Sequence, residues 1–315
     1  YHHVSTDTPP STSISPEDFE KHLHYLKEND FNVIALNQMI ETLKAGEKLP
    51  NKAVAITFDD GYISIYDTAF PMLQSYGFPF TLFLSTGPID RQQQNFINWE
   101  QIKEMSSAGV IIANHMVEHP YMLDRAQDES DVEWINRLEK ELLKAELRIE
   151  QQTGQSHRYL AYPFGEFNTE IKNMLEANDF IGLAQNSGAV GVNSDFLALP
   201  RFPLASIYAN LETAKIKLDS KAFNVDLIQP LSPVTQDRNP PVTLKFNDGN
   251  YNLSQIGCFA NSRPLPMTWI DKSQGLLKIE PNESYSGRRW RYLCTAPVTG
   301  ENRFYWYSVQ WIKPD

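Results

Sequence analysis

Short apolar segments alternate with amphipathic helical patterns along the first two thirds of the chain, and this alternation constrains the fold more than any other feature. Each apolar segment has the length of one buried strand. Strands that alternate with helices predict βαβ units and a parallel sheet or barrel. We therefore expect an α/β fold whose strands lie near residues 53–57, 80–84, 110–113, 159–162 and 181–184.

The segments between these strands carry helix start and stop signals. Ser15 and Pro16 offer an N-cap followed by proline at the first helical position. Asn98 precedes a helix that Gly109 ends. A longer helix ends before Gly154, and its apolar stripe consists of Ile135, Leu138, Leu142 and Ile149.

The pattern changes near residue 225, where helical periodicity stops. The proline-rich segment 226–241 reads as a linker. Short alternating runs follow, separated by turn signals such as Asn247-Asp248-Gly249. This pattern is typical of a small antiparallel β-sandwich. We therefore predict a barrel domain over 1–225 and a β-sandwich domain over 242–315, which would be accessory or carbohydrate-binding.

Charge and composition restrict the partners. The chain has 28 Lys and Arg against 39 Asp and Glu, a net charge of −11, and 41% hydrophobic residues. Residues 226–315 carry +2 and the remainder −13, so the acidic balance belongs to the predicted barrel. A protein that binds nucleic acid through its phosphates usually presents a basic face, so we expect no nucleic-acid partner. No apolar run reaches the ~18 residues of a membrane span.

Cys258 and Cys294 are the only cysteines, and both lie in the predicted β-sandwich. A disulfide and a pair of buried free thiols remain open as alternatives. Zinc binding by this pair is not favoured, because the same segment has neither His nor a CxxC motif. The sequence starts at Tyr1 rather than Met, which fits a removed signal peptide. We therefore expect an extracellular, periplasmic or cell-surface protein.

The first candidate site is Thr57-Phe58-Asp59-Asp60-Gly61, which follows an apolar strand. The carboxyl ends of parallel strands are where α/β proteins and barrels build active sites. Two adjacent Asp side chains at a strand end point in different directions, so they can take different roles. An ordinary Asp-Asp-Gly turn is the alternative.

The second candidate is His115-Met-Val-Glu-His119-Pro120, after the next predicted strand but one. Histidines at i and i+4 on a helical turn can bind one metal ion. Two His and one carboxylate make a complete ligand set for a catalytic zinc with one position left for water. Asp60 could supply that carboxylate and leave Asp59 free as a base.

The same residues also spell H-x-x-E-H, the signature of an inverted zinc protease with Glu118 as the base. This interpretation leaves the Asp59-Asp60 pair unexplained, so we rank it below the first.

Three weaker features complete the set. The Tyr162-Pro163-Phe164-Gly165 turn can present a backbone N–H to an oxyanion, or it can be a packing turn. Arg201, flanked by proline and phenylalanine, would pair with a carboxylate at an active site or in a structural salt bridge. By itself, the opening Tyr1-His2-His3-Val4 does not indicate a function.

Together these motifs resemble the polysaccharide deacetylases of carbohydrate esterase family 4, which share the NodB homology domain. The resemblance covers about residues 1–215 and rests on Thr57–Gly61, His115-x-x-x-His119-Pro120 and Tyr162–Gly165, in that order.

Two departures indicate one branch of that family. The usual Arg beside the third motif is displaced to Arg158, and no His follows His157 to act as the late acid. The chain is thus similar to the circularly permuted poly-β-1,6-N-acetylglucosamine deacetylases, in which an N-terminal Tyr-His-x-Val/Ile supplies that acid. Tyr1-His2-His3-Val4 matches this pattern.

The resemblance implies a distorted (β/α)7-type barrel and N-deacetylation of a glycan that contains N-acetylglucosamine. Poly-β-1,6-N-acetylglucosamine is the favoured substrate and chitin-type chains are the alternative. The cofactor would be Zn²⁺, with Co²⁺ or Ni²⁺ as substitutes. The implied roles are metal ligation by Asp60, His115 and His119, base catalysis by Asp59 with Arg201 as its partner, acid catalysis by His2, oxyanion binding at Phe164, and substrate contact by Tyr162, Pro163 and Trp99.

A different class of function remains open. The barrel could be a degenerate deacetylase that only binds carbohydrate. The aromatic residues of the C-terminal segment could stack on sugars, although at least half of them should fill a sandwich core. The sequence does not indicate an oligomeric state.

Overall fold

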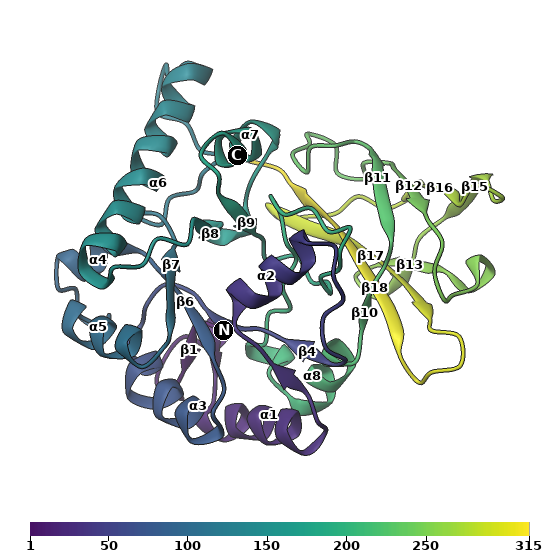
Figure 1. Ribbon diagram of the computed structural model, residues 1–315. Coiled ribbons are helices and arrows are strands. Elements are labelled where there is room, and N and C mark those ends of the chain that lie inside the picture. The colour runs from purple at the N-terminus through teal and green to yellow at the C-terminus, as the bar shows by residue number, and fades with distance from the viewer. Residues whose placement is uncertain (315) are drawn as a thin grey trace.

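The structure is a computed structural model that describes residues 1–314, and its chain path is drawn in Figure 1. The α-helices of this part of the chain are α1 (Pro16–Glu28), α2 (Leu36–Lys44), α3 (Phe70–Tyr76), α4 (Thr86–Asp90), α5 (Trp99–Ser107), α6 (Asp131–Thr153), α7 (Thr169–Ala177) and α8 (Leu211–Leu218). The strands of its first two thirds are β1 (His3–Val4), β2 (Ser13–Ile14), β3 (Asn32–Val33), β4 (Ala53–Val54), β5 (Ile56–Phe58), β6 (Phe80–Leu84), β7 (Ile111–Asn114), β8 (Tyr159–Ala161) and β9 (Ile181–Leu183). The later strands are β10 (Lys221–Ala222), β11 (Val225–Gln229), β12 (Val242–Phe246), β13 (Gly257–Ala260), β14 (Arg263–Pro264), β15 (Met267–Asp271), β16 (Leu276–Ile279), β17 (Arg289–Pro297) and β18 (Phe304–Ile312).

A curled parallel sheet forms the centre of the N-terminal part. Its strands pair in the order β5-β6-β7-β8-β9, and every pairing is parallel. Helices α1, α3, α5 and α6 lie around the outside of this sheet (Figure 1). The expected α/β fold with parallel strands is thereby confirmed.

The sheet differs from the seven-stranded barrel that we expected. Strands β1 and β2 pair only with each other, and so do β3 and β4, so neither pair joins the five-stranded ladder. Beyond β9, a single parallel bridge links Leu183 to Leu199. The parallel sheet is therefore a half-barrel that the short pairs and loops extend.

Local sequence signals explain why the helices begin and end where they do. Ser15 caps α1 by accepting a hydrogen bond from the Asp18 backbone N–H. Helix α6 starts with a capping box between Ser130 and Glu133 and ends at Gly154, whose φ of +72° suits glycine. Strands β6, β7, β8 and β9 of the parallel sheet are buried on both faces.

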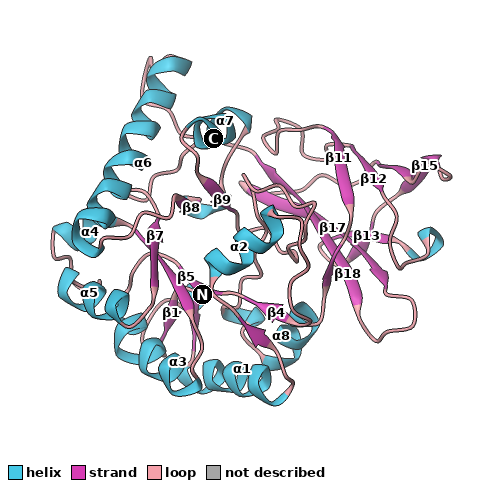
Figure 2. Cartoon of the chain, viewed as in Figure 1, coloured by secondary structure: helices cyan, strands magenta, loops and turns pink. Residues whose placement is uncertain are grey.

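Residues 221–314, which we call the C-terminal β region, contain two sheets (Figure 2). One sheet has the order β10-β18-β17-β13-β14 and the other the order β11-β12-β16-β15. Side chains from both sheets share one apolar cluster. Residues 226–229, which we placed in a linker, belong instead to β11, because they pair with β12.

The cysteines and aromatic residues of this region are mainly structural. Cys258 on β13 and Cys294 on β17 lie opposite each other and form a disulfide. Trp290, Tyr292 and Trp311 are buried in the shared cluster, whereas the indole N–H of Trp306 donates to the Ser187 carbonyl of the N-terminal part. No helix among the described residues is long and apolar enough to cross a membrane.

Candidate active site

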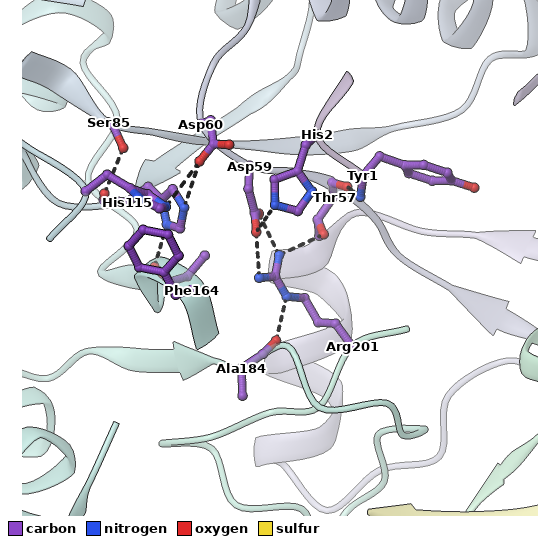
Figure 3. A network of polar contacts seen from close by, with 12 residues as sticks. Tyr1, His2, Thr57, Asp59, Asp60, Ser85, His115, Phe164, Ala184 and Arg201 are labelled. Atoms are coloured by element: carbon purple, nitrogen blue, oxygen red, sulfur yellow. Dashed lines mark hydrogen bonds and ion pairs between the residues drawn. The ribbon is translucent and has the colours of Figure 1, made fainter. Parts of the chain in front are cut away.

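The candidate catalytic residues gather where several parallel strands end. Asp59 and Asp60 follow β5, His115 follows β7, and the turn that contains Phe164 follows β8. Parallel strands bring these ends to one edge of the sheet, so motifs far apart in the sequence lie together (Figure 3).

Asp60, His115 and His119 form a cluster that could hold a metal ion. One ligand atom from each residue lies within 4.8 Å of the other two. The Asp60 Oδ1 atom is 3.1 Å from His115 Nε2 and 3.4 Å from His119 Nε2. One carboxylate oxygen and two imidazole nitrogens match the donor set of a catalytic zinc site.

The hydrogen bonds around this cluster fit a bound cation. Asp60 Oδ1 and His115 Nε2 are both buried, and neither makes a hydrogen bond. The two atoms lie 3.1 Å apart and face each other across the cluster. The other ring nitrogen of His115, Nδ1, donates to the Ala161 carbonyl at 2.6 Å. This contact leaves the Nε2 lone pair free to face a metal ion.

The charges at the cluster also favour a bound cation. Burial lowers the pKa of His119 to about 4, with a further contribution from His115, so the ring is neutral at neutral pH. Burial would lower the pKa of His115 as well, but the Asp60 and Asp59 carboxylates outweigh it and raise that pKa. The two carboxylates therefore favour positive charge at this point, and a divalent cation would supply it.

We expected the two histidines on a helical turn, but the structure places them elsewhere. Residues 115–120 form a loop in which Met116 and His119 have positive φ angles of 66° and 52°. The Asn114 side chain accepts a hydrogen bond from the Met116 backbone N–H at 2.8 Å and supports this loop. The loop, rather than helical periodicity, turns both imidazoles toward Asp60.

Asp59 is buried beside the cluster and is held by Arg201. The arginine Nη1 and Nη2 atoms donate to Oδ1 and Oδ2 of Asp59 at 2.7 and 2.8 Å. The Ala184 carbonyl accepts from Arg201 Nε at 2.9 Å, and Thr57 accepts from Nη1 at 3.2 Å. Burial alone would raise the pKa of Asp59, but Arg201 and the nearby histidines keep it well below its ordinary value. Asp59 is therefore a carboxylate at neutral pH.

His2, near the start of the sequence, also lies close to Asp59. The backbone of Tyr1 donates to the Thr57 carbonyl, and its own carbonyl accepts from the Asp59 N–H, both at 3.0 Å. This pairing places His2 Nε2 4.0 Å from Asp59 Oδ2 (Figure 3). Burial lowers the pKa of His2 to about 4, although Asp59 acts in the opposite direction.

Phe164 lies beside the histidines. Its φ is +57°, in a turn bounded by Pro163 and Gly165. Its ring centroid is 4.4 Å from that of His119 and 3.8 Å from that of Tyr121, on which it stacks. The turn therefore holds the Phe164 ring against His119 of the metal-ligand cluster.

The burial of Tyr162 and Pro163 contradicts the substrate contacts expected of these two residues. The Tyr162 side chain is fully buried, and its hydroxyl donates to the Leu197 carbonyl at 2.6 Å. Pro163 is also buried. Trp99 donates to Asp90 at 2.8 Å and packs under the Arg148 guanidinium, between α4, α5 and α6. Tyr162 and Pro163 therefore belong to the scaffold, whereas Trp99 is partly exposed and its contact with substrate stays a prediction.

The protease interpretation also fails on geometry. Both carboxylate oxygens of Glu118 accept hydrogen bonds from Arg91, at 2.6 and 2.8 Å, and the side chain is 52% exposed. A base in the H-x-x-E-H pattern would have to face the metal. Glu118 is instead engaged in a surface ion pair.

Sequence reasoning missed contributions from the C-terminal β region. Arg289 donates to the Phe164 carbonyl, and Gln310 donates to the Gly165 carbonyl at 2.7 Å. Arg288 makes an ion pair with Glu166, the residue after this turn. The two adjacent arginines are visible in the sequence, but nothing in the sequence indicates which loop they contact.

The fold and the site define this chain as an α/β protein with a half-barrel sheet and a His-His-Asp cluster at the ends of its strands. Residues 46–181 match the family model described as polysaccharide deacetylase. This part of the chain is therefore a polysaccharide deacetylase domain.

Known relatives agree with this assignment. The poly-β-1,6-N-acetyl-D-glucosamine N-deacetylase of Staphylococcus epidermidis is 28% identical over 194 residues, which are 60% of this chain and 67% of that protein. The Escherichia coli K12 enzyme of the same name is 25% identical over 190 residues, 50% of this chain but 28% of its own length. The Streptococcus pyogenes deacetylase PplD, solved with acetate, shares the fold with a TM-score of 0.62 at 22% identity, covering 69% of this chain and 95% of PplD.

Proposed function

We propose that the protein is a metal-dependent N-deacetylase that hydrolyses the acetamide groups of a polymer rich in N-acetylglucosamine. The observation that carries this proposal is the position of the Asp60–His115–His119 cluster beside the buried Asp59–Arg201 pair. The first group would hold the metal ion, and the second would hold a base in its ionised form. Metal-assisted amide hydrolysis uses both.

Asp59 is the proposed base. A divalent cation such as Zn²⁺, held by Asp60, His115 and His119, would polarise the acetamide carbonyl and lower the pKa of a nearby water toward about 7. Asp59 accepts a proton from the water that attacks the carbonyl carbon. Arg201 keeps Asp59 ionised and fixes its orientation through the two-point contact.

His2 and Phe164 complete the proposed reaction. The Phe164 backbone N–H donates to the oxyanion that forms on the carbonyl oxygen. The carbon–nitrogen bond then breaks, and His2 donates a proton to the sugar amine. Because the pKa of His2 is about 4, the ring is neutral at rest. The proton that His2 donates therefore comes from Asp59, which takes it from the attacking water and whose Oδ2 atom lies 4.0 Å from His2 Nε2. The products are acetate and a glucosamine unit.

Poly-β-1,6-N-acetylglucosamine is the substrate that we favour. Relatives from Staphylococcus and Escherichia carry this polymer in their names. The net charge of −11 suits a polymer that is neutral before the reaction and cationic after it. We also propose that the protein works outside the cytoplasm, because the Cys258–Cys294 disulfide is typical of oxidising compartments.

Acetate release tests the function. The purified protein is incubated with β-1,6-linked and β-1,4-linked N-acetylglucosamine oligomers, with Zn²⁺ and after chelation. We expect release from the β-1,6 series with Zn²⁺, and none from Asp59→Asn. Binding without acetate release from either series would reject the enzyme and favour a carbohydrate-binding protein.

A further inference from the structure

Arg288, from the C-terminal β region, contacts two loops of the deacetylase domain at once. Its Nε atom donates to Oε1 of Glu166 at 2.8 Å, and its Nη2 atom donates to Oε2 of Glu166 at 2.9 Å. The same Nη2 atom lies 2.6 Å from Asp124 Oδ1. Glu166 follows the turn that contains Phe164, and Asp124 follows the loop that contains His119.

The ring contacts continue this bridge toward the site. The guanidinium of Arg288 lies over the Tyr121 ring at 4.5 Å, and Tyr121 stacks on Phe164 with an interplanar angle of 5°. The Phe164 ring in turn packs against His119. A continuous set of contacts therefore joins Arg288 to a proposed metal ligand and to the proposed oxyanion donor.

Two further side chains of the β region bind the same turn. Arg289 donates to the Phe164 carbonyl, and Gln310 donates to the Gly165 carbonyl. Arg289 begins β17 and Gln310 lies on β18, and these strands pair along nine residues, from Arg289–Ile312 to Pro297–Phe304. The turn is therefore anchored to a rigid two-stranded ladder rather than to a mobile loop.

The burial of Glu166 shows that this contact is more than a surface bridge. Its side chain is fully buried, and Arg288 at 2.8 Å is the nearer of two arginines that compensate its charge, with Arg289 at 3.7 Å. A buried carboxylate without a partner is strongly unfavourable, so the turn after Phe164 depends on an arginine from outside the family-matched residues 46–181.

We propose that Arg288 is a positioning residue for the deacetylase site, and that the C-terminal β region thereby sets the geometry of the Phe164 turn and the His119 loop. This inference rests on the proposed function, because Phe164 and His119 matter only if the site is catalytic. Arg288 contacts neither the metal-ligand cluster nor the proposed base, so it acts through the two loops.

The test compares Arg288→Ala with Arg263→Ala. Arg263 forms a similar ion pair with Glu283 in the same region, at 2.8 and 2.9 Å, but is 72% exposed. We expect Arg288→Ala to lower kcat about 10- to 100-fold with a much smaller change in KM, because displaced groups lose transition-state contacts. Arg288→Lys should recover part of the loss, since it restores the charge without the two-point contact. Arg263→Ala should match the wild type.

Hydrogen exchange supplies a readout that does not require activity. The amides of Asp124, Gly165 and Glu166 close the two loops through backbone hydrogen bonds. They should exchange faster in Arg288→Ala and remain unchanged in Arg263→Ala. Should Arg288→Ala fail to fold, Gln310→Leu removes only the bond to Gly165 and should show a smaller effect of the same kind.

The outcomes separate the two proposals. Unchanged kcat and unchanged exchange in folded Arg288→Ala would overturn the positioning role. Wild-type protein that releases no acetate would reject the deacetylase function, while the exchange rates would still show whether Arg288 holds the two loops.

Discussion

Arg201 contacts both carboxylate oxygens of Asp59, with Nη1 2.7 Å from Oδ1 and Nη2 2.8 Å from Oδ2. The two residues are separated by 142 positions in sequence, and Asp59 is almost fully buried. A buried carboxylate stays ionised only when a paired charge compensates its lost hydration. Arg201 therefore decides whether Asp59 is a base at neutral pH.

Replacing Arg201 with methionine should shift the pH profile of the reaction. Burial raises the pKa of Asp59 and Arg201 is the main group that lowers it, so removal of Arg201 leaves only the nearby histidines to oppose the effect of burial. A base with a raised pKa is protonated up to a higher pH. The acid limb of kcat/KM should therefore move upward by about 1 to 3 pH units. Arg158→Met is the control, because Arg158 donates to the Asn178 carbonyl instead. An unmoved acid limb in Arg201→Met would contradict the assignment of Asp59 as the base.

Metal removal should abolish acetate release and lower the thermal stability. A ligand that binds only the folded protein stabilises it by about 3 kcal/mol when its free concentration is about 100 times its Kd. Chelation should thus lower Tm, and added Zn²⁺ should restore both Tm and activity. His115→Ala should show no response of Tm to Zn²⁺, whereas His24→Ala, at an exposed position of α1, should respond like the wild type. An equal response in His115→Ala would place the metal elsewhere.

The sequence predicted the strands well because they are buried on both faces. Residues 80–84 were expected as a strand and form β6, and the expected 159–162 differs from β8 by one residue. Short parallel strands with continuous apolar residues have few alternative structures. The seven-stranded barrel was wrong because closure depends on which strands pair, and β1 to β4 are only two residues long.

Part of the candidate site was predictable because its residues lie at the ends of the predicted strands. Asp59, Asp60, His115 and Phe164 follow strands directly, so the order of the strands brings them to one edge. The contacts of Arg288 with Glu166 and Asp124 cross 122 and 164 residues and depend on how the β region packs against the sheet. No local pattern encodes that packing, so its role was missed.

Tyr162→Phe tests the correction at the third motif. The Tyr162 hydroxyl donates to the Leu197 carbonyl inside the core, at 2.6 Å, and contacts no ligand of the cluster. Loss of this bond leaves a partly buried carbonyl without its partner, so we expect stability to fall by about 1 kcal/mol, measured by denaturant unfolding. Activity should stay at the wild-type level. Tyr66→Phe, which removes an exposed bond to Glu104, is the control and should cost little. A raised KM without a loss of stability would return Tyr162 to the substrate site.

Lys217 should make the stability depend on pH in a window remote from the active site. Its side chain is almost fully buried, and its ammonium donates to the Pro203 carbonyl at 2.7 Å. Burial, with a smaller effect of Arg291, lowers the pKa of Lys217 from 10.5 to about 8. Between these values the unfolded chain binds a proton that the folded protein does not, so stability rises with pH from about 8 to 10.5 and the cost of the buried charge is complete below pH 8.

Lys217→Met removes this dependence. The stability of the wild type relative to Lys217→Met should increase by about 3 kcal/mol between pH 7 and pH 10.5, because one pKa unit corresponds to about 1.4 kcal/mol. Denaturant unfolding at several pH values measures the difference and cancels the titration of other groups. Lys215→Met, on the same helix in a surface ion pair with Glu212, is the control for the loss of a lysine from α8. A pH-independent difference for Lys217→Met would show that Lys217 stays charged in the folded protein throughout this range.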